Sequence, residues 1–152
     1  MQDMTPSLAV VADWDASLRA VDDFLGTGDV DRARMQVKQL LHSSEHSLSE
    51  LNRAHALLRL AYCDLLSSKT SRAYEAARSA ASMFHEANSA ADEVSATALV
   101  ALCAARLGRS VESVETALAA VYLAEDQPKG SWSARAHLSL AVAYAWAQSF
   151  AK

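Results

Sequence analysis

Two histidines have the spacing in this sequence that most resembles a metal site. His42 and His46 lie four positions apart with Glu45 between them, so both imidazoles would project from one face of a continuous helix. However, the segment 42–47, HSSEHS, is typical of a helix end, where a histidine satisfies the last free carbonyl groups. A structural zinc site needs four ligands, and no third ligand is evident here. We therefore predict no metal site and no cofactor.

The two cysteines, Cys63 and Cys103, are 40 positions apart. If they occupy equivalent places on neighbouring packed helices, the helix axes would be about 8–10 Å apart. A disulfide requires Cα atoms within about 7 Å of each other. We expect both cysteines to be small buried residues, and the sequence leaves a redox role open.

Paired carboxylates could perform acid–base chemistry, and the chain has two such pairs, Asp13/Asp15 and Asp22/Asp23. A solvated helix face explains both pairs more simply. The sequence contains no glycine-rich phosphate loop and no HExxH, GxSxG or CxxC motif. We therefore predict that this chain has no catalytic residues and is not an enzyme, although a catalytic domain could follow Lys152.

The composition predicts an all-α protein. Apolar residues make up 51% of the chain and many of them are alanine, the best helix former, whereas only four glycines and two prolines are present. The formal charge of −4 is mild, and no basic cluster indicates nucleic acid as a partner. Because the sequence has neither a signal peptide nor an apolar run of membrane-spanning length, we expect a cytoplasmic protein that does not bind membranes.

Three segments repeat one plan at a period of about 40 residues. The segments 20–41, 60–81 and 99–121 each read as a helix, a tight break and a second helix, with the breaks at Gly28, Ser68 and Gly108. A fixed period of this size is typical of helical hairpins stacked into a solenoid. We predict about seven helices in a single domain, 1–152, with repeats at 6–43, 47–86 and 89–124 and a half repeat at 131–150.

Capping signals and apolar stripes predict the helices in more detail. We expect the first helix to begin at Thr5–Pro6, the second to be capped by Asp29, and the third to begin at Ser47 with Glu50 completing a capping box. The predicted later helices are 70–86, about 91–107, about 110–124 and 132–150. The last of these should turn Leu138, Ala141 and Ala145 inward. It would be either the first half of an incomplete hairpin, which would make the chain a piece of a longer protein, or a cap on the helix before it.

The repeating unit resembles the tetratricopeptide repeat, a helical hairpin with small residues at fixed sites and a turn between its helices. The small-residue sites of the first helices would be Val21, Ala61, Ala101 and Ala141. Those of the second helices would be Ala33, Ala73 and Ser113, followed by Leu40, Ala80 and Ala120; Val21 and Leu40 depart from the pattern. The resemblance implies a TPR-like solenoid, but the period exceeds the 34 residues typical of the family and the usual aromatic sites are mostly absent. The basic clamp for a peptide carboxylate is also missing.

The segment from 99 to 152 is also similar to repeat regions that precede a GGDEF domain, a diguanylate cyclase, in some bacterial signalling proteins. This resemblance implies a regulatory N-terminal module whose catalytic output domain lies outside the chain.

In tetratricopeptide arrays the first helices of the hairpins line a concave surface, and the resemblance implies such a surface here. Its predicted residues are His55, Leu58, Tyr62, Leu65, Leu102, Arg106, Arg135, Leu138, Val142 and Trp146. Aromatic and arginine side chains of this kind dominate binding hot spots. The same leucine stripes would also serve as plain helix packing, and the sequence alone leaves both interpretations open.

The sequence supports two function hypotheses. In the first, the chain is a protein–protein interaction and regulatory module that binds a protein segment or forms a homodimer through an apolar end made of Tyr144, Trp146 and Phe150. In the second, the chain is a small-ligand sensor with an apolar pocket between Tyr62, Leu102 and Trp146.

Overall fold

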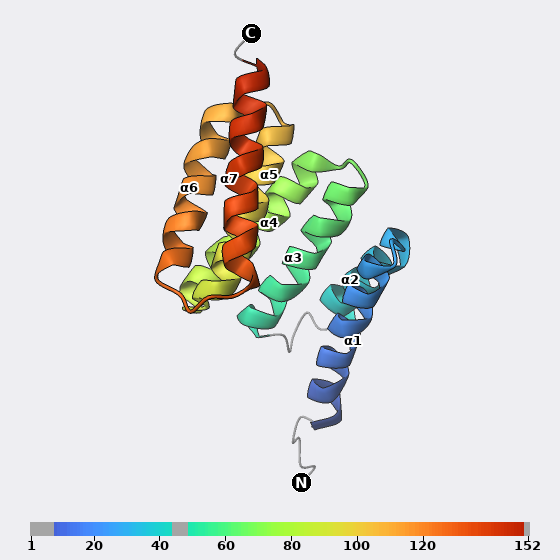
Figure 1. The fold of residues 1–152 in the computed structure, drawn as a ribbon. Helices are drawn as coiled ribbons and strands as arrows, with labels where there is room; N and C mark the ends of the chain where they lie inside the picture. Colours follow the sequence, from blue (N-terminus) through green and yellow to red (C-terminus); the bar gives the residue numbers. More distant parts are fainter. Residues whose placement is uncertain (1–7, 44–48, 151–152) are drawn as a thin grey trace.

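The computed structural model of the chain describes residues 8–43 and 49–150, with side chains described for 14–42 and 49–149. Over these residues it contains seven α-helices and no β-strand, which confirms the all-α class (Figure 1). The helices are α1 (Leu8–Gly26), α2 (Val30–Ser43), α3 (Glu50–Leu66), α4 (Thr70–Glu86), α5 (Ala90–Arg106), α6 (Ser110–Glu125) and α7 (Ser131–Phe150). The predicted start at Thr5–Pro6 lies outside the described residues.

The helices recur at a regular interval along the chain. Helices α2 to α6 begin at residues 30, 50, 70, 90 and 110, so each starts 20 residues after the one before it. Gly28, Ser68 and Gly108 end α1, α3 and α5 with positive φ angles of 81°, 59° and 76°. Each lies in the same helix-ending turn; at Gly108, for example, Arg109 N donates to Ala104 O at 2.9 Å and Gly108 N donates to Ala105 O at 3.0 Å. The predicted breaks are therefore confirmed as bends between successive helices.

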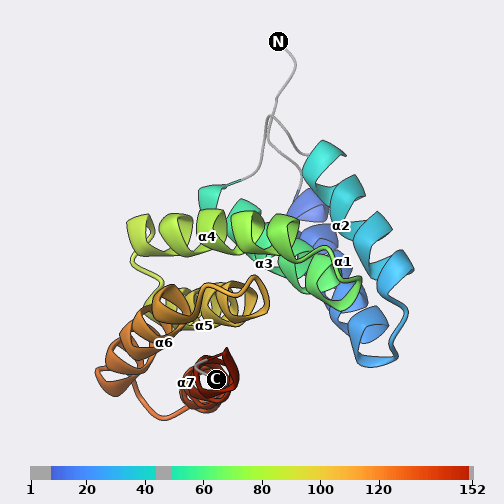
Figure 2. The same ribbon diagram turned by 90° about the horizontal axis from the view of Figure 1, so that it is seen from above.

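The helices pack in chain order, and alternate helices also touch. Each helix from α1 to α6 packs on the next one, α5 also packs closely on α7, and smaller contacts join α1 to α3 and α3 to α5. Seen from above, α1 and α2, α3 and α4, and α5 and α6 form successive pairs, with α7 against the last pair (Figure 2). Mostly small side chains at the predicted sites permit this close packing. The buried ones are Ala61 and Ala101; Ala33, Ala73 and Ser113; and Ala80 and Ala120, while the larger Val21 and Leu40 are also buried.

The bounds of α4 match the prediction, and Ala73, Ala77, Ala80 and Phe84 on its inner face are fully buried. The start of α3 was predicted wrongly. Ser49, not Ser47, is the N-cap, since its side chain accepts a hydrogen bond from Asn52 N at 3.1 Å, and Glu50 is the first helical residue.

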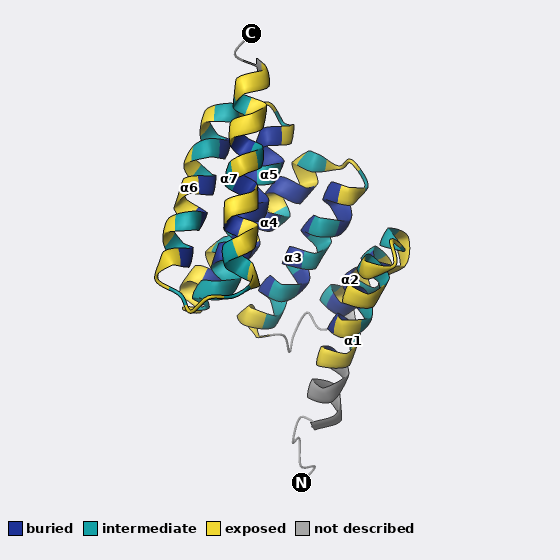
Figure 3. Cartoon of the chain, viewed as in Figure 1, coloured by how far each residue is buried: buried dark blue, intermediate teal, exposed yellow. Residues whose placement is uncertain are grey.

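Helix α7 has a different register from the predicted one. Ala136, Ser139 and Ala143 are its buried residues, whereas Leu138, Ala141 and Ala145 are exposed (Figure 3). Because α7 packs on both α5 and α6, the residues at this junction must be small. Alanines occur on both the buried and the exposed side of this helix, so they do not show which side packs inward, and the predicted stripe fell on the exposed side.

Residues at equivalent positions, 40 residues apart, make different kinds of contact between successive helix pairs. Arg34 of α2 forms a buried ion pair with Asp64 of α3, with Nη2 and Oδ1 3.2 Å apart. Tyr74, the residue 40 positions after Arg34, is on α4 and its hydroxyl donates a hydrogen bond to Glu112 of α6. Position 114, a further 40 residues on, is a valine.

Cys63 and Cys103 are both buried and unbonded, as predicted for small core residues. Burial raises the pKa of both thiols, that of Cys103 to about 11, so the reactive thiolate is disfavoured at neutral pH. Among the described residues, no helix has the combination of length and apolar character that crossing a bilayer requires.

Candidate functional site: a groove along α3

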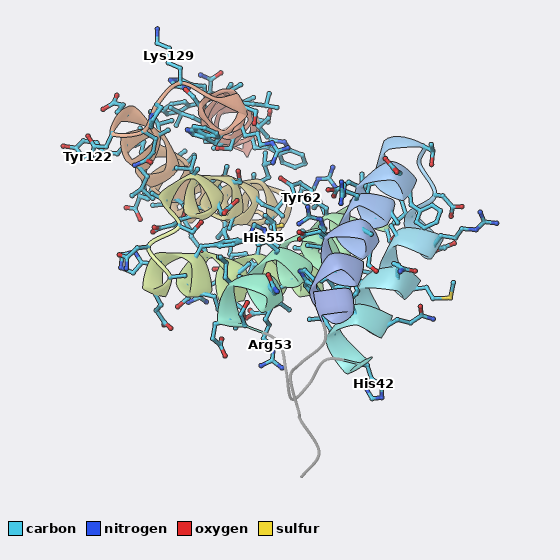
Figure 4. All side chains as sticks on the ribbon, turned by 90° about the horizontal axis from the view of Figure 1, so that it is seen from below. His42, Arg53, His55, Tyr62, Tyr122 and Lys129 are labelled. Carbon is cyan, nitrogen blue, oxygen red and sulfur yellow. The ribbon has the colours of Figure 1, made fainter. Side chains whose placement is uncertain are left out.

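A groove runs along one side of α3, with α1 on one flank and α5 and α7 on the other. Its main cavity has a volume of about 440 Å³ and is lined by residues of four helices: Asp22, Leu25, His55, Leu58, Arg59, Tyr62, Asp92, Ser95 and Arg135. A second cavity of about 470 Å³ shares Asp22, His55 and Arg59 with the first and extends between α1 and the start of α3. We call the two cavities together the α3 groove. In Figure 4 the labelled side chains of His55 and Tyr62 lie between α1 and the C-terminal helices.

The floor of the groove comes from one stripe of α3. Asn52, His55, Arg59 and Tyr62 are spaced by three or four residues and therefore lie on one side of this helix. Only weak contacts join α1 to α3 and α3 to α5, so the outer helices form the walls without covering this stripe. Arg135 reaches the main cavity from α7.

A two-point ion pair fixes the α1 wall of the groove. Arg59 Nε and Nη2 donate to the two carboxylate oxygens of Asp22, each at 2.8 Å. This paired geometry is the strong form of an arginine–carboxylate contact. The Asp22/Asp23 pair was predicted to be a solvated face, and both residues are exposed. In addition, Asp22 joins α1 to α3 through Arg59, a contact across 37 residues that no local sequence pattern indicates.

His55 connects the floor of the groove to the α5 wall. Its Nε2 lies 3.6 Å from Asp92 Oδ2, and its ring makes an edge contact with Phe84, with 5.0 Å between the ring centroids. Burial lowers the pKa of His55, against the opposing effect of Asp92. Ser89 Oγ also donates a hydrogen bond to Asp92 Oδ2 at 2.6 Å, so one oxygen of this carboxylate has a protein partner.

The pKa shift of His55 predicts a pH effect on stability. Because the folded protein holds His55 with a lowered pKa, the unfolded chain binds more protons, and stability should fall as the pH decreases below about 6.5. Thermal unfolding of wild type and of His55→Gln at neutral and mildly acidic pH would measure this. We expect the Tm of wild type to fall more than that of the variant, whereas equal decreases would contradict the prediction.

Two hydrogen-bond donors of the groove remain available to a ligand. Arg135 is exposed and forms no ion pair with any carboxylate of the described residues. Tyr62 is partly buried; burial raises the pKa of its hydroxyl, and the nearby charge of Arg135 opposes this shift. Asp22 is paired with Arg59, and the groove also offers these two donors and apolar surface from Leu25 and Leu58.

The structure gathers some of the predicted surface residues and separates others. His55, Leu58, Tyr62 and Arg135 line the main cavity, whereas Leu102, Arg106, Leu138 and Trp146 line neither cavity of the groove. Leu65 is core, packed with α4 and α5, and Leu138 is 61% exposed on the outside of α7. Arg106 donates from Nη1 to Leu65 O at 3.2 Å and so helps to join α5 to α3.

The predicted surface did not include the charged groove residues Asp22, Arg59 and Asp92. All three are charged residues on helix surfaces, and only the angle between neighbouring helix pairs brings them together.

The metal hypothesis concerns residues that are only partly described. His42 is exposed at the end of α2, whereas Glu45 and His46 lie outside the described residues. Within 8–43 and 49–150 there is no group of three or more His, Cys, Asp or Glu side chains that could hold a metal ion.

Comparison of the chain with protein-family models, with curated proteins and with solved structures gives no match. The arguments for function therefore rest on the geometry of the groove and of the helix surfaces.

Proposed function

We propose that this chain is a non-catalytic, TPR-like interaction module whose α3 groove binds a segment of a partner protein. The recurrence of one helix-ending turn at Gly28, Ser68, Asn88 and Gly108, and the packing of each helix on the next, support the solenoid interpretation. The convergence of His55, Tyr62 and Arg135 on one cavity supports the binding site. That this module regulates a linked diguanylate cyclase is a prediction that depends only on the sequence resemblance.

The chemistry of the groove favours a particular type of segment. Arg135 and the Tyr62 hydroxyl can donate to a carboxylate or carbonyl group, while Leu25 and Leu58 accept an apolar side chain. A basic segment would compete with Arg59 for Asp22, whose two carboxylate oxygens Arg59 already engages. The expected ligand is therefore a segment that combines an acidic and an apolar residue.

A random peptide display library selected on the wild-type chain would test this proposal. We expect the enriched peptides to contain acidic residues and to bind at least about 10-fold more weakly to Tyr62→Ala and to Arg135→Glu, as for loss of a hot-spot contact. Fluorescence anisotropy of labelled peptides would give the dissociation constants.

Lys129→Glu is the matched control, because Lys129 is an exposed cation on the loop before α7, far from Tyr62 in Figure 4. Its charge reversal should leave the affinity within about twofold, a small change by comparison with a hot-spot loss. The absence of enriched peptides, or binding that is indifferent to Tyr62 and Arg135, would contradict the proposal.

The volume of the main cavity also favours a second candidate, a small carboxylate ligand, because about 440 Å³ is within the range of small-molecule sites. The cavity differs from the predicted apolar pocket, since Leu102 and Trp146 do not line it and charged residues do. A thermal-shift screen with small organic acids distinguishes this candidate. A ligand that raises the Tm of wild type but not of Arg135→Glu would support it.

A further inference from the structure

A second groove lies between α2 and α4, on the side of α3 opposite to the α3 groove. Its main cavity has a volume of about 680 Å³, and its basic and apolar lining residues are Lys38, Leu41, His42, Arg53, Leu57 and Met83. A cavity of about 530 Å³ continues it along α2 and shares Lys38 and His42 with it. We call these two cavities together the outer groove.

The packing of the helices leaves the outer groove open. Among the described residues α2 and α4 make no direct backbone contact with each other, whereas each of them packs on α3. Arg53 and Leu57 form the floor, and at about 100° per residue they lie on the side of α3 away from His55 and Arg59. In Figure 4 the labelled side chains of His42 and Arg53 lie at the same edge of the molecule, apart from Tyr62 of the α3 groove.

The fold produces an equivalent hollow one repeat later, with a different lining. A cavity of about 460 Å³ lies between α4 and α6, and Arg78, 40 positions after Lys38, lines it. At the positions equivalent to Leu41, His42 and Leu57 this cavity has Ala81, Ser82 and Thr97, and it also includes the carboxylate of Glu112. Helix geometry therefore explains the hollow, but it does not explain why the outer groove is basic and apolar.

The positive charges of the outer groove have no partners. Among the described residues, no carboxylate lines either of its cavities. Lys38 is exposed and Arg53 is half-buried, and neither side chain has an ion pair or a hydrogen bond within the part of the chain that the structure describes. Arg34 and Arg59, by contrast, are paired with Asp64 and Asp22. The outer groove is therefore complementary in charge to an acidic ligand.

We propose that the outer groove binds a segment of a partner protein that carries two or more acidic residues around an apolar one. Carboxylates of the segment would pair with Lys38 and Arg53, and its apolar side chain would pack on Leu57 and Met83 in the main cavity. Met35 lines the continuation along α2 and is 57% exposed, which provides an adaptable apolar contact. This site is separate from the α3 groove, so either proposal can fail alone.

The lining favours a protein segment over a nucleic acid or a membrane. Of the described residues that line the outer groove, none is aromatic, so bases would have no ring on which to stack. The net charge of −4 opposes the approach of the chain to nucleic acid or to an anionic bilayer. Leu57 is half-buried at the floor of the hollow, where a protruding side chain can reach it but a flat surface cannot.

Peptide display on the Tyr62→Ala/Arg135→Glu chain would test the proposal, because these replacements remove the two free donors of the α3 groove. We expect the enriched peptides to contain at least two acidic residues and an apolar one. Fluorescence anisotropy should give the same affinity for wild type within about twofold, and at least about 10-fold weaker binding to Lys38→Glu/Arg53→Glu. Lys38→Gln/Arg53→Gln adds no carboxylate and should weaken binding in the same direction by a smaller factor.

Lys69→Glu/Lys129→Glu is the matched control, because it changes the net charge equally at two exposed lysines that line neither cavity of the outer groove. It should leave the affinity within about twofold. Circular dichroism should show the helix content of wild type in every variant, since the Lys38 and Arg53 side chains have no partner in the described fold.

Two results of the display experiment would overturn the proposal. One is a selection that enriches no acidic peptides, and the other is acidic peptides that bind equally to Lys38→Glu/Arg53→Glu and to the control. Sedimentation with vesicles of phosphatidylcholine and phosphatidylserine provides a further test. If wild type sedimented with these vesicles and Lys38→Glu/Arg53→Glu did not, the two cations would belong to a membrane-binding surface, and the proposal would be wrong.

Discussion

Replacing Arg34 with alanine is expected to reduce the free energy of unfolding by about 3–5 kcal/mol, the typical result of leaving a buried charge without its partner. Asp64 is only 1% exposed, and Arg34 lies across the α2–α3 junction from it, with 3.2 Å between Nη2 and Oδ1. Arg72 offers a weaker replacement, since its Nε is 3.7 Å from Asp64 Oδ2 and its side chain is largely exposed. Urea denaturation followed by circular dichroism would measure the loss.

The double replacement Arg34→Met/Asp64→Leu provides the control. Neither Arg34 Nε nor Asp64 Oδ1 has a hydrogen-bond partner, so the pair is incompletely compensated for its burial. An apolar pair of similar volume should therefore be about as stable as wild type, or more stable. If Arg34→Ala lost less than about 1 kcal/mol, the range of a surface ion pair, the charge on Asp64 would not depend on Arg34.

The sequence predicted the helices better than the contacts between them. Helix bounds follow from local signals such as Gly28, Gly108 and the alanine stripe of α4, and these were found within one or two residues for most helices. Arg34 and Asp64 are 30 positions apart and each looks like a surface charge. Their pairing depends on how one helix pair stacks on the next, which no local pattern contains.

The same limit explains which groove residues were predicted. His55 and Tyr62 are recognisable because they lie on one stripe of a single helix, and Arg135 because it occupies the matching position of α7. Asp22 and Asp92 line the groove only because α1 and α5 lie on either side of α3. There Asp22 contacts Arg59 and Asp92 contacts His55. The register of α7 failed for a related reason, because alanine marks neither the inside nor the outside of a helix.

Replacing Phe84 with alanine should affect both the core and the groove. Its side chain is fully buried between α3, α4 and α5, so the truncation should reduce the free energy of unfolding by about 3–5 kcal/mol. The ring also lies against His55, where burial is the main cause of the lowered pKa. Opening this contact should admit water and move the pKa of His55 upward, toward 6.5.

Two measurements on one pair of variants separate these effects of Phe84. Urea denaturation gives the stability, and an NMR titration of the His55 ring protons gives its pKa. Phe84→Leu keeps an apolar side chain of similar reach, so it should lose less stability and leave the pKa of His55 closer to that of wild type. If Phe84→Ala lost stability with no change in the pKa of His55, the ring would support the core without desolvating the groove. The burial that lowers the pKa would then come from other groups around His55, with the charge of Arg59 acting in the same direction.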